Sequence, residues 1–515
     1  MDLDLSSIHE ESHVTALEES SIVENLNLQH GDVGHNRSFE IIPRGSKKNT
    51  DLLLDGLGYS YTIKSRFPNS TTWMCTRRSG PNPCRATVRQ QNRDFIHTKK
   101  HLHRGDNEIH DKVKIRQEVK KKAIENKFGS ARDMVEDIFM EYSHQHPQVF
   151  FPDLANSIRL ANKTRAKLVP PNPMNINFEL KTEFIPPNFF RGEIAYFDED
   201  QNYQGRHLLF MSNEQIDLLA NAKRWYVDGT FHIVNTKLFH QLFTIHAFLR
   251  KDDNIKQVPL AFILMSSRKT KDYELVFRKV LETLPYTRVK EIVSDFEKAL
   301  WKCVRNLNSD KILKTFKNVK HFGCAFHFTQ AIYRKMQDIG LVVSYKKVHE
   351  VSEFCRRLMS IHLIYYKDIS FTFQILKSKI SMIPKYENKL TLLADYFEEN
   401  WLKNTLWEPK CWSVFNQPIR TNNDVEGWHL RMKNKAKNGN LPIYSLFSLL
   451  FKESEFITIQ ADLLSRKKLK RSQKKQYKSI QSKLFKHWNE FENRKNSADP
   501  ICPWKLLKIV AALYS

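Results

Sequence analysis

The order of strand-like and helix-like patterns between residues 224 and 339 constrains the fold of this 515-residue chain more than any other feature. Three apolar, strand-like runs follow one another at residues 224–233, 239–250 and 256–265. Helical and strand patterns then alternate, at 271–283 (helix), 289–294 (strand), 296–306 (helix), 316–325 (strand) and 327–339 (helix). Short apolar runs bounded by turn residues favour buried strands, whereas apolar spacing of three and four favours helices. The sequence therefore predicts an α/β domain.

Three strands followed by alternating helices and strands is the order of a ribonuclease-H-like fold. In that order Asp228 lies on the first strand, within Trp225–Phe231, and Asp295 ends the fourth. These two strands are neighbours in such a sheet, so we expect the two carboxylates to converge. An Asp in an apolar run is costly to bury without a partner. Taken alone, it also fits a strand-end residue that caps a turn.

A third acid, Glu426, follows residues 421–423, which form a helix N-cap sequence, and is expected in the first turn of that helix. A predicted helical insertion at 341–415 separates it from Asp295. Carboxylates on three separate elements suit Mg²⁺ or Mn²⁺, since these hard cations prefer oxygen ligands. Two such ions, ~4 Å apart, serve phosphodiester chemistry. Asp228 is expected to bridge both ions, with Asp295 and Glu426 each holding one.

Cys324 and His327 form a weaker candidate site, because their Cys-x-x-His spacing is typical of metal ligands. Two ligands do not complete a zinc site. The pair could be joined by a later residue such as His429, or it could pack as part of the structure, and both interpretations stay open.

Residues 49–106 are predicted to form a small β-rich module with four candidate zinc ligands, Cys75, Cys84, His101 and His103. Two thiolates and two imidazoles make a tetrahedral zinc set, and a module of this size gains stability from a metal. The spacing differs from that of common zinc fingers. The alternative is two reduced cysteines and two surface histidines.

Charge is distributed unevenly along the chain. The formal net charge is +25. Residues 1–40 carry nine acidic residues against the single basic Arg37, a net charge of −8, which leaves +33 to the remaining chain. Such an excess favours a polyanionic partner, here double-stranded DNA, although a lysine-rich protein without such a partner remains the alternative. Residues 1–48 are predicted to be a disordered acidic tail.

Two basic regions flank the predicted core. Residues 107–190 are predicted to be a basic helical region followed by a proline-rich linker, and the helix could lie along DNA or only present a charged face to solvent. Residues 441–515 are predicted to be a basic helical C-terminal region. Its run 466–475 fits a nuclear-entry signal, a contact with the DNA backbone, or a charged surface.

The cysteine content and the hydropathy of the chain limit the cellular compartments in which the protein is expected to act. Seven cysteines, an odd number in a long chain, indicate a reducing compartment rather than a disulfide scaffold. The acidic, polar start does not have the pattern of a signal peptide, and no run of 18 apolar residues occurs, so no membrane contact is expected. We expect the protein to act in the nucleus.

Four motifs are similar, in order and spacing, to those of the Mutator-like element (MULE) transposases. They are Val227-Asp228-Gly229-Thr230-Phe231, Ser294-Asp295-Phe296-Glu297-Lys298-Ala299, Cys324-Ala325-Phe326-His327-Phe328 and Thr421-Asn422-Asn423-x-x-Glu426-Gly427-Trp428-His429. The resemblance covers roughly residues 190–440. It implies a catalytic triad of Asp228, Asp295 and Glu426, with 191–340 as the first part of the core and 416–440 as the core helix. It also implies a homodimer on DNA.

The N-terminal module resembles a FLYWCH zinc finger in four short motifs. They are Gly58-Tyr59-x-Tyr61, Trp73-Met74-Cys75, Cys84-Arg85-Ala86 and His101-Leu102-His103. The resemblance implies that Zn²⁺ is held by the Cys-Cys-His-His set at Cys75, Cys84, His101 and His103. Such a finger ahead of a MULE core is a combination that the family shows.

Three functions are compatible with these patterns. The first is an active DNA transposase that binds transposon ends and cuts and rejoins DNA strands. The second is a domesticated DNA-binding regulator that retains the fold without transposition. The third is a zinc-finger interaction protein with an incidental α/β domain, and it predicts that the three carboxylates do not meet.

Overall fold

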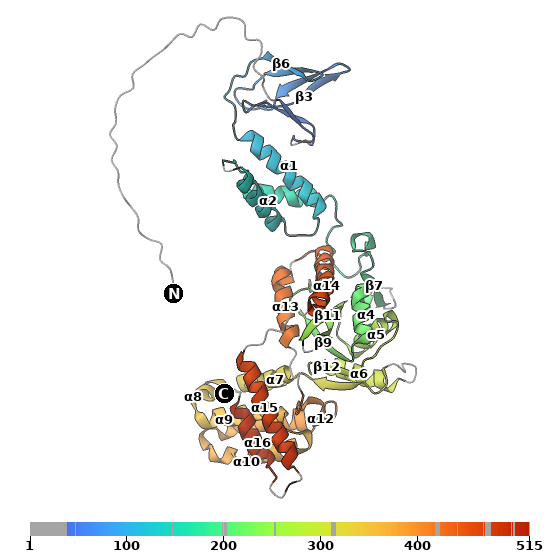
Figure 1. The fold of residues 1–515 in the computed structure, drawn as a ribbon, viewed down its shortest axis with the longest axis vertical. Coiled ribbons are helices and arrows are strands. Elements are labelled where there is room, and N and C mark those ends of the chain that lie inside the picture. The colour runs from blue at the N-terminus through green and yellow to red at the C-terminus, as the bar shows by residue number, and fades with distance from the viewer. Residues whose placement is uncertain are drawn as a thin grey trace, which may run out of the picture. The chain divides into compact units, whose positions relative to one another are not determined.

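The computed structural model describes residues 39–513, apart from 47, 147, 198, 200–202, 252–253, 311–315, 418–422, 440, 467, 469–474, 496 and 498–499. The chain divides into two compact units, Met1–Lys122 with Ala131–Ala161, and Ala123–Ser130 with Asn162–Ser515 (Figure 1). Three predictions lie wholly or largely outside the described residues. These are the acidic tail up to residue 38, the N-cap sequence at 421–422 and most of the basic run 466–475.

The first unit is built on a six-stranded antiparallel sheet in which each strand pairs with the next. The strands are β1 (Glu40–Ile42), β2 (Leu52–Leu54), β3 (Ser60–Phe67), β4 (Ser70–Cys75), β5 (Thr87–Gln91) and β6 (Asp94–Lys99). Strand β1 lies within the range predicted to be a tail, so the sequence boundary at residue 48 is wrong. The physical reason is the burial of Ile42 against Leu52, Leu54 and Val113.

Three helices follow this sheet, α1 (Ile109–Glu125), α2 (Ala131–Gln145) and α3 (Leu154–Arg165), as the helical pattern predicts. Val113 of α1 is buried against β1 and β2. Several lysines of the basic helix α1 are paired with carboxylates, namely Lys112 with Glu108, Lys114 with Glu40 and Lys122 with Glu141. Part of its charge is therefore neutralised within the first unit.

The second unit contains a seven-stranded sheet in the order β13-β12-β9-β10-β11-β8-β7. The strands are β7 (Phe190–Phe197), β8 (Tyr203–Phe210), β9 (Arg224–Thr230), β10 (Gln241–Lys251), β11 (Asn254–Met265), β12 (Glu291–Ser294) and β13 (Lys320–Gly323). The pairs from β7 to β9 are antiparallel, whereas β12 runs parallel to both β9 and β13. The strand that carries Asp228 is therefore the neighbour of the strand that precedes Asp295, as expected.

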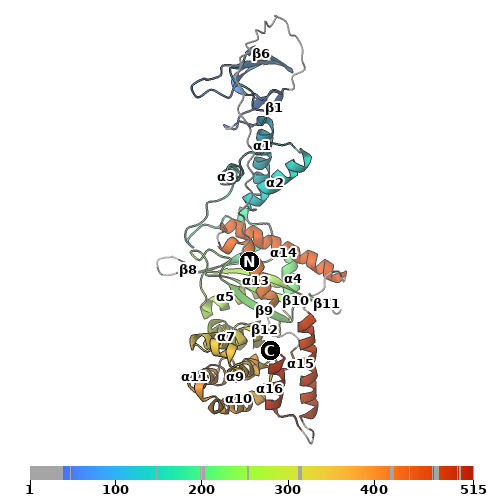
Figure 2. The same ribbon diagram turned by 90° about the vertical axis from the view of Figure 1, so that its left-hand side faces the viewer.

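Helices cover both faces of this sheet (Figures 1 and 2). On one face, α4 (Asn213–Asn221), α5 (Thr270–Thr283) and α6 (Lys298–Ser309) pack on a core that includes Val227 and Ile263. On the other face, α13 (Asn423–Lys435) and α14 (Ile443–Ser465) pack through Trp428 and Phe447 on Phe262. Helix α14, predicted as part of a separate C-terminal region, thus belongs to the core of the sheet.

The segment that the prolines marked as a linker packs on the same sheet face as α14. Ile185 and Phe189 are buried there, and Phe178 packs beside them. The Arg206 guanidinium, which is 1% exposed, donates hydrogen bonds of 2.6 Å to the main-chain oxygens of Ile176 and Phe178. The linker prediction is wrong for this segment, because its apolar residues between the prolines find partners on the sheet.

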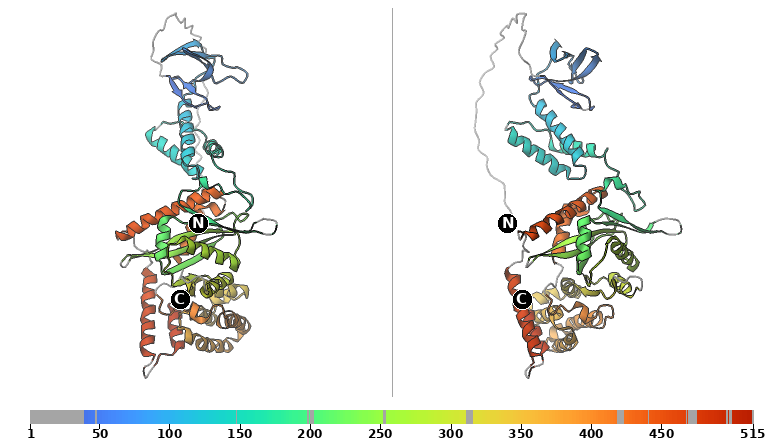
Figure 3. Two further views of the ribbon diagram at one scale, coloured as in Figure 1. Left: turned by 90° about the vertical axis from the view of Figure 1, so that its right-hand side faces the viewer. Right: turned by 45° about the vertical axis from the view of Figure 1, so that its right-hand side comes forward.

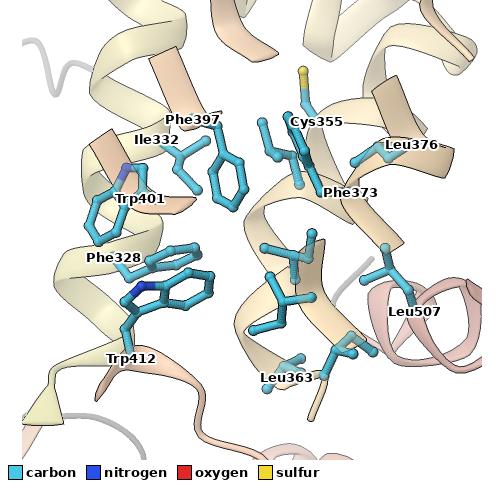
Figure 4. Packing of buried hydrophobic residues seen from close by; sticks show 14 of the residues in the cluster. Phe328, Ile332, Cys355, Leu363, Phe373, Leu376, Phe397, Trp401, Trp412 and Leu507 are labelled. Carbon is cyan, nitrogen blue, oxygen red and sulfur yellow. The ribbon is translucent and has the colours of Figure 1, made fainter. Parts of the chain in front are cut away.

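The insertion is helical, as predicted, and has its own core (Figure 4). After α7 (Ala325–Asp338) it contains α8 (Val342–Lys347), α9 (His349–Ser360), α10 (Ile369–Ser378), α11 (Glu387–Phe397) and α12 (Pro409–Trp412). Phe328 of α7 stacks on Trp412, with ring centroids 4.9 Å apart. Helices α15 (Lys475–Arg494) and α16 (Pro503–Ala512) complete this core with Trp488 and Leu507 (Figure 3). None of the described helices is long and apolar enough to cross a membrane.

Candidate active site

Asp228 lies near the end of the interior strand β9, on the sheet face that α13 covers. Successive side chains of a strand alternate between faces. Trp225 and Val227 accordingly enter the core beneath α5 and α6, and Asp228 shares the other face with Tyr226. Asp228 is 6% exposed, and its Oδ1 accepts a hydrogen bond of 2.9 Å from the main-chain N of Gly229.

Asp295 directly follows β12, the parallel neighbour of β9. Parallel strands place their carboxyl ends at the same sheet edge, where ligands of open α/β sheets bind. The indole Nε1 of Trp301 donates a hydrogen bond of 2.7 Å to the main-chain oxygen of Asp295, and the main-chain N of Glu297 donates one of 3.3 Å to its carboxylate. These bonds hold the turn that carries the Asp295 side chain.

Glu426 enters the site from the first turn of α13, as expected. The preceding residue, Val425, anchors this turn because it is buried against Tyr226 and Val293. Oε1 of Glu426 lies 3.2 Å from Nε2 of His327, at the start of α7. Helix α13 therefore returns the chain to the sheet edge after the long insertion.

Helix α13 is held to α14 through one buried carboxylate. Glu453 of α14 is 5% exposed and accepts hydrogen bonds from Trp428, Arg431 and Lys435 of α13. The bond from the indole Nε1 measures 3.0 Å, and that from the Lys435 ammonium 2.8 Å. These contacts fix the helix that carries Glu426 on the sheet.

Asp228, Glu426 and His327 form the tight group of the site, since their ligand-capable atoms all lie within 4.8 Å of one another. Asp295 is not a member of this group, although its charge acts on the Asp228 carboxyl and the charge of Glu426 acts on Asp295. The predicted residue Cys324 is fully buried and is not a member either. The structure thus brings two of the three predicted acids into direct proximity and adds one member of the Cys-x-x-His pair.

Burial and mutual repulsion set the protonation of these acids. Burial raises the pKa of Asp228 to about 8; the carboxyls of Asp295 and Glu426 act in the same direction, and His327 opposes them. Burial also raises the pKa of Asp295. The hydrogen bond with His327 lowers the pKa of Glu426. Burial disfavours a charged His327, but hydrogen bonds with Cys324 and Glu426 raise its pKa to about 11.

Polar residues of β10 and α13 surround Asp228. Of these, the sequence suggested only His429, as a possible further ligand beside Cys324 and His327. Thr244 lies opposite Asp228 in the strand register and donates a hydrogen bond of 3.2 Å to its main-chain oxygen. The same hydroxyl lies 3.4 Å from Nε2 of His429 and 3.0 Å from Nε2 of His246. Nδ1 of His429 lies 3.6 Å from Oδ2 of Asp228. Two sequence patterns could have identified these residues. Polar residues alternate with apolar ones in β10, and the spacing of three from Glu426 to His429 places both side chains on one face of a helix.

A second group of potential metal ligands lies in the first unit. Sγ of Cys75 is 3.3 Å from Nε2 of His103, and Sγ of Cys84 is 3.4 Å from Nδ1 of His101. All four ligand atoms lie within 4.8 Å of one another. The structure brings all four predicted residues together. Burial raises the pKa of Cys75 to about 11, and the neighbouring Cys84 thiol adds to this shift.

Aromatic residues and one carboxylate orient this second group. The hydroxyl of Tyr61 donates a hydrogen bond of 2.7 Å to Asp55 and lies 2.8 Å from Nε2 of His101. A hydroxyl that donates to Asp55 accepts from Nε2–H, which leaves Nδ1 of His101 as the unprotonated nitrogen facing the thiols. Tyr59 stacks on His101 with ring centroids 3.7 Å apart and donates a hydrogen bond to the main-chain oxygen of His103.

Comparison with known proteins places a family domain on this sheet. Residues 224–331 match the MULE transposase domain. The matched range contains Asp228, Asp295, Cys324 and His327, whereas Glu426 lies beyond it. No curated protein matches the chain. Residues 224–331 are thus similar to the MULE transposase domain, and this match implies a transposase-type function and suggests DNA as a partner.

Proposed function

We propose that this chain is a DNA transposase of the Mutator-like class, which binds transposon ends and cuts and rejoins DNA strands by metal-dependent phosphodiester chemistry. One observation carries the proposal: acids from separate elements meet at one sheet edge. Asp228 from β9 and Glu426 from α13 have carboxylate oxygens within 4.8 Å of each other, and Asp295 follows the neighbouring strand. Buried carboxylates repel one another and raise their pKa values, so a site that gathers them favours a cation.

The core that we propose for residues 191–340 and α13 is ribonuclease-H-like. The strand order supports this assignment. Strands β11, β10 and β9 are antiparallel neighbours, and β12 and β13 continue the sheet in parallel from β9. In this order the first and fourth strands of the core, β9 and β12, carry the first and second acids to one edge.

The donor set fits Mg²⁺ or Mn²⁺, with Asp228, Asp295 and Glu426 holding the ions. Mg²⁺ prefers hard oxygen ligands and keeps several waters, and two of these carboxylates already lie within 4.8 Å of each other. When bound, two such ions supply activation of the attacking oxygen and stabilisation of the leaving oxygen.

The chain's own residues hold the acids in place. Gly229 and Thr244 fix the end of β9 through hydrogen bonds to the side chain and main chain of Asp228. His327 orients the Glu426 carboxylate. Burial lowers the pKa of His429 to about 4, so this imidazole is neutral at pH 7 and adds no positive charge at Asp228.

We further propose that residues 49–106 form a FLYWCH-like zinc finger, with Zn²⁺ held by Cys75, Cys84, His101 and His103. Two thiols and two imidazoles are a tetrahedral zinc set, and their ligand atoms lie within 4.8 Å of one another. Zn²⁺ binding favours the thiolate form that burial of Cys75 otherwise disfavours. The finger and the basic helix α1 would contact duplex DNA, and the chain's net charge of +25 favours such a partner.

The proposal includes a homodimer on DNA and a nuclear site of action. Both rest on the resemblance to transposases, which hold two DNA ends together. The basic C-terminal sequence supports the nuclear assignment through its lysine and arginine content.

An excision assay tests the proposal. The donor is the genomic DNA that flanks the coding region, and the proteins are wild type, Glu426→Gln and the control Glu282→Gln, whose side chain is 65% exposed on α5. Excision by wild type and control but not by Glu426→Gln supports the proposal. Excision by Glu426→Gln at the wild-type level refutes the assignment of the third acid. If no protein excises and wild type binds the flanks, a domesticated DNA-binding regulator is the better conclusion.

A further inference from the structure

A pocket of about 420 Å³ lies beside the segment that follows β9, and the chemistry proposed above does not use it. Its walls come from residues 231–232 and 234–237, from residues 172–174, and from Gly439 and Leu441 after α13. Its volume falls within the range of pockets that bind small ligands.

The walls of this pocket are held in place by contacts with the sheet and with α14. The wall at 172–174 precedes the segment that Arg206 binds through the main-chain oxygens of Ile176 and Phe178. Oδ1 of Asn172 accepts a hydrogen bond of 3.0 Å from the main-chain N of Ile443. Gly439, which also lines the pocket, has a φ of +85°, and a Cβ there would lie 3.0 Å from the main-chain oxygen of Val234. The pocket is therefore largely pre-formed.

The lining combines apolar surface with polar and positively charged groups. Phe231 is 43% exposed and Met174 is 77% exposed, although both are large apolar side chains. Lys237 supplies an ammonium group, and Asn235 accepts a hydrogen bond from the main-chain N of Lys237 through Oδ1, which leaves its amide N–H groups as potential donors. A nucleotide has the complementary chemistry, since its base has a flat face that stacks on aromatic rings and its phosphate is negatively charged.

One lining residue of the pocket, Phe231, is close in sequence to the candidate catalytic residue Asp228. Phe231 follows Asp228 by three residues, so at most about 11 Å of main chain separates their Cα atoms. The Arg268 guanidinium lies 4.8 Å from the centroid of the Phe231 ring. Burial raises the pKa of Asp295 and the Arg268 charge counteracts this shift, so Arg268 is within electrostatic reach of the site. A separation within this limit spans at most about three base steps of a DNA strand.

We propose that this pocket binds one nucleotide of the DNA strand that flanks the reacting phosphodiester, with the base against Phe231 and a phosphate near Lys237. The inference rests on the function proposed for the neighbouring acids. The pocket positions the strand relative to these acids and takes no part in the bond changes. Because stacking needs only the flat face of a base, the site accepts different bases.

Photocrosslinking of the full-length chain tests the location. The probe is a single-stranded oligodeoxythymidine that carries one 5-iododeoxyuridine, and the crosslinked peptides are identified by mass spectrometry. We expect a crosslink at Phe231 in the wild type. The pocket assignment is overturned if crosslinks occur only elsewhere, or if the wild type does not bind the probe.

Binding of the same oligonucleotide to variants tests the chemistry. Loss of one base–aromatic contact weakens binding by about tenfold or more, so Phe231→Ala should weaken binding of the oligonucleotide by this factor. Lys237→Gln should reduce the dependence of binding on salt concentration, because it removes a contact with a phosphate. The matched controls are Phe371→Ala, 59% exposed on α10, and Lys302→Gln on the exposed face of α6; both should bind as wild type does. Equal binding by Phe231→Ala and wild type, with both proteins folded by thermal melting, contradicts the proposal.

Two outcomes separate this inference from the function on which it rests. Excision by wild type without a crosslink at Phe231 refutes the pocket assignment and leaves the transposase proposal intact. A crosslink at Phe231 combined with excision by the Glu426→Gln variant at the wild-type level supports the pocket and refutes the assigned acid.

Discussion

Replacing Asp228 with asparagine should stabilise the protein in the absence of divalent cations at neutral and alkaline pH. In the folded state burial raises the pKa of Asp228 from 3.8 to about 8. Because the folded pKa lies above the unfolded one, folding favours the protonated acid. The resulting destabilisation is absent below about pH 4, grows as pH rises and is complete above about pH 8. One pKa unit corresponds to about 1.4 kcal/mol, so the raised pKa of Asp228 destabilises the folded state by about 4 kcal/mol at pH 7 relative to an unfolded chain in which this carboxyl is ionised.

Thermal unfolding of protein dialysed free of Mg²⁺ measures this effect. The amide oxygen of the introduced asparagine can still accept the hydrogen bond from Gly229, so the main change is the loss of the charge. For a domain of 150–250 residues, 1 kcal/mol shifts Tm by roughly 2–4 °C, which gives Asp228→Asn a Tm higher by on the order of 10 °C at pH 7. The control Asp217→Asn changes an exposed residue of α4 and should melt as wild type does. Added Mg²⁺ or Mn²⁺ should raise the Tm of wild type but not that of Asp228→Asn.

Two results would refute this reasoning. If Asp228→Asn melts at or below the wild-type temperature at pH 8.5, ionised Asp228 is compensated inside the folded protein. If the difference in Tm between variant and wild type does not close as pH falls towards 4, it arises from packing and not from titration of the carboxyl.

Three further changes test contacts described above. Tyr61→Phe removes the hydroxyl that orients one zinc-ligand imidazole and should weaken Zn²⁺ binding by about 10–100-fold in a chelator competition; unchanged affinity would contradict the role of the hydroxyl. Glu453→Gln weakens the three hydrogen bonds to α13 and should lower the free energy of unfolding by ~1–3 kcal/mol in a denaturant titration, with equal stability as the contrary result. Gly323→Ala places a Cβ 2.1 Å from the ring of Phe296 and should destabilise the fold by ~1–3 kcal/mol. Gly427→Ala is its control, because nothing lies within 4 Å of the added Cβ, and a helix gains about 1 kcal/mol from that exchange; equal Tm shifts would contradict the packing argument.

The sheet around Asp228 could be predicted because its signals are local. Apolar runs and turn residues mark each strand, and a strand order then follows from the sequence of elements. The prediction that β9 and β12 are neighbours is confirmed by the parallel pairing of Trp225 with Ile292. The place of Glu426 in a first helical turn also follows from local sequence.

The partners of amphipathic helices could not be predicted, since a pattern shows that a face is buried but not what covers it. Helices α14 and α15 both bury aromatic residues, yet Phe447 packs on the sheet and Trp488 packs in the insertion. The segment around Phe178 and Phe189 illustrates the same limit. Its prolines indicate a linker, but its aromatic residues pack on the sheet.

The candidate site was predictable only in part for a similar reason. Motif spacing identifies Asp228 and Glu426, but the side chains that face them depend on register and on helix orientation. A shift of one residue in β10 would turn Thr244 and His246 away from Asp228. His327, and not Asp295, completes the tight group because α7 starts at the same sheet edge.

The return of α15 and α16 to the insertion has a consequence for synthesis of the protein. Residues 341–415 leave the ribosome well before residues 484–510. The later residues supply Trp488, Leu507 and the other side chains that complete the core of the insertion. At about 5–20 residues per second, this delay lasts roughly 5–20 s. Throughout it, the apolar faces that the last two helices later cover are exposed on the nascent chain. The insertion therefore completes its fold only after residues 484–510 have been synthesised, and we expect its exposed apolar surface to be prone to aggregation until then.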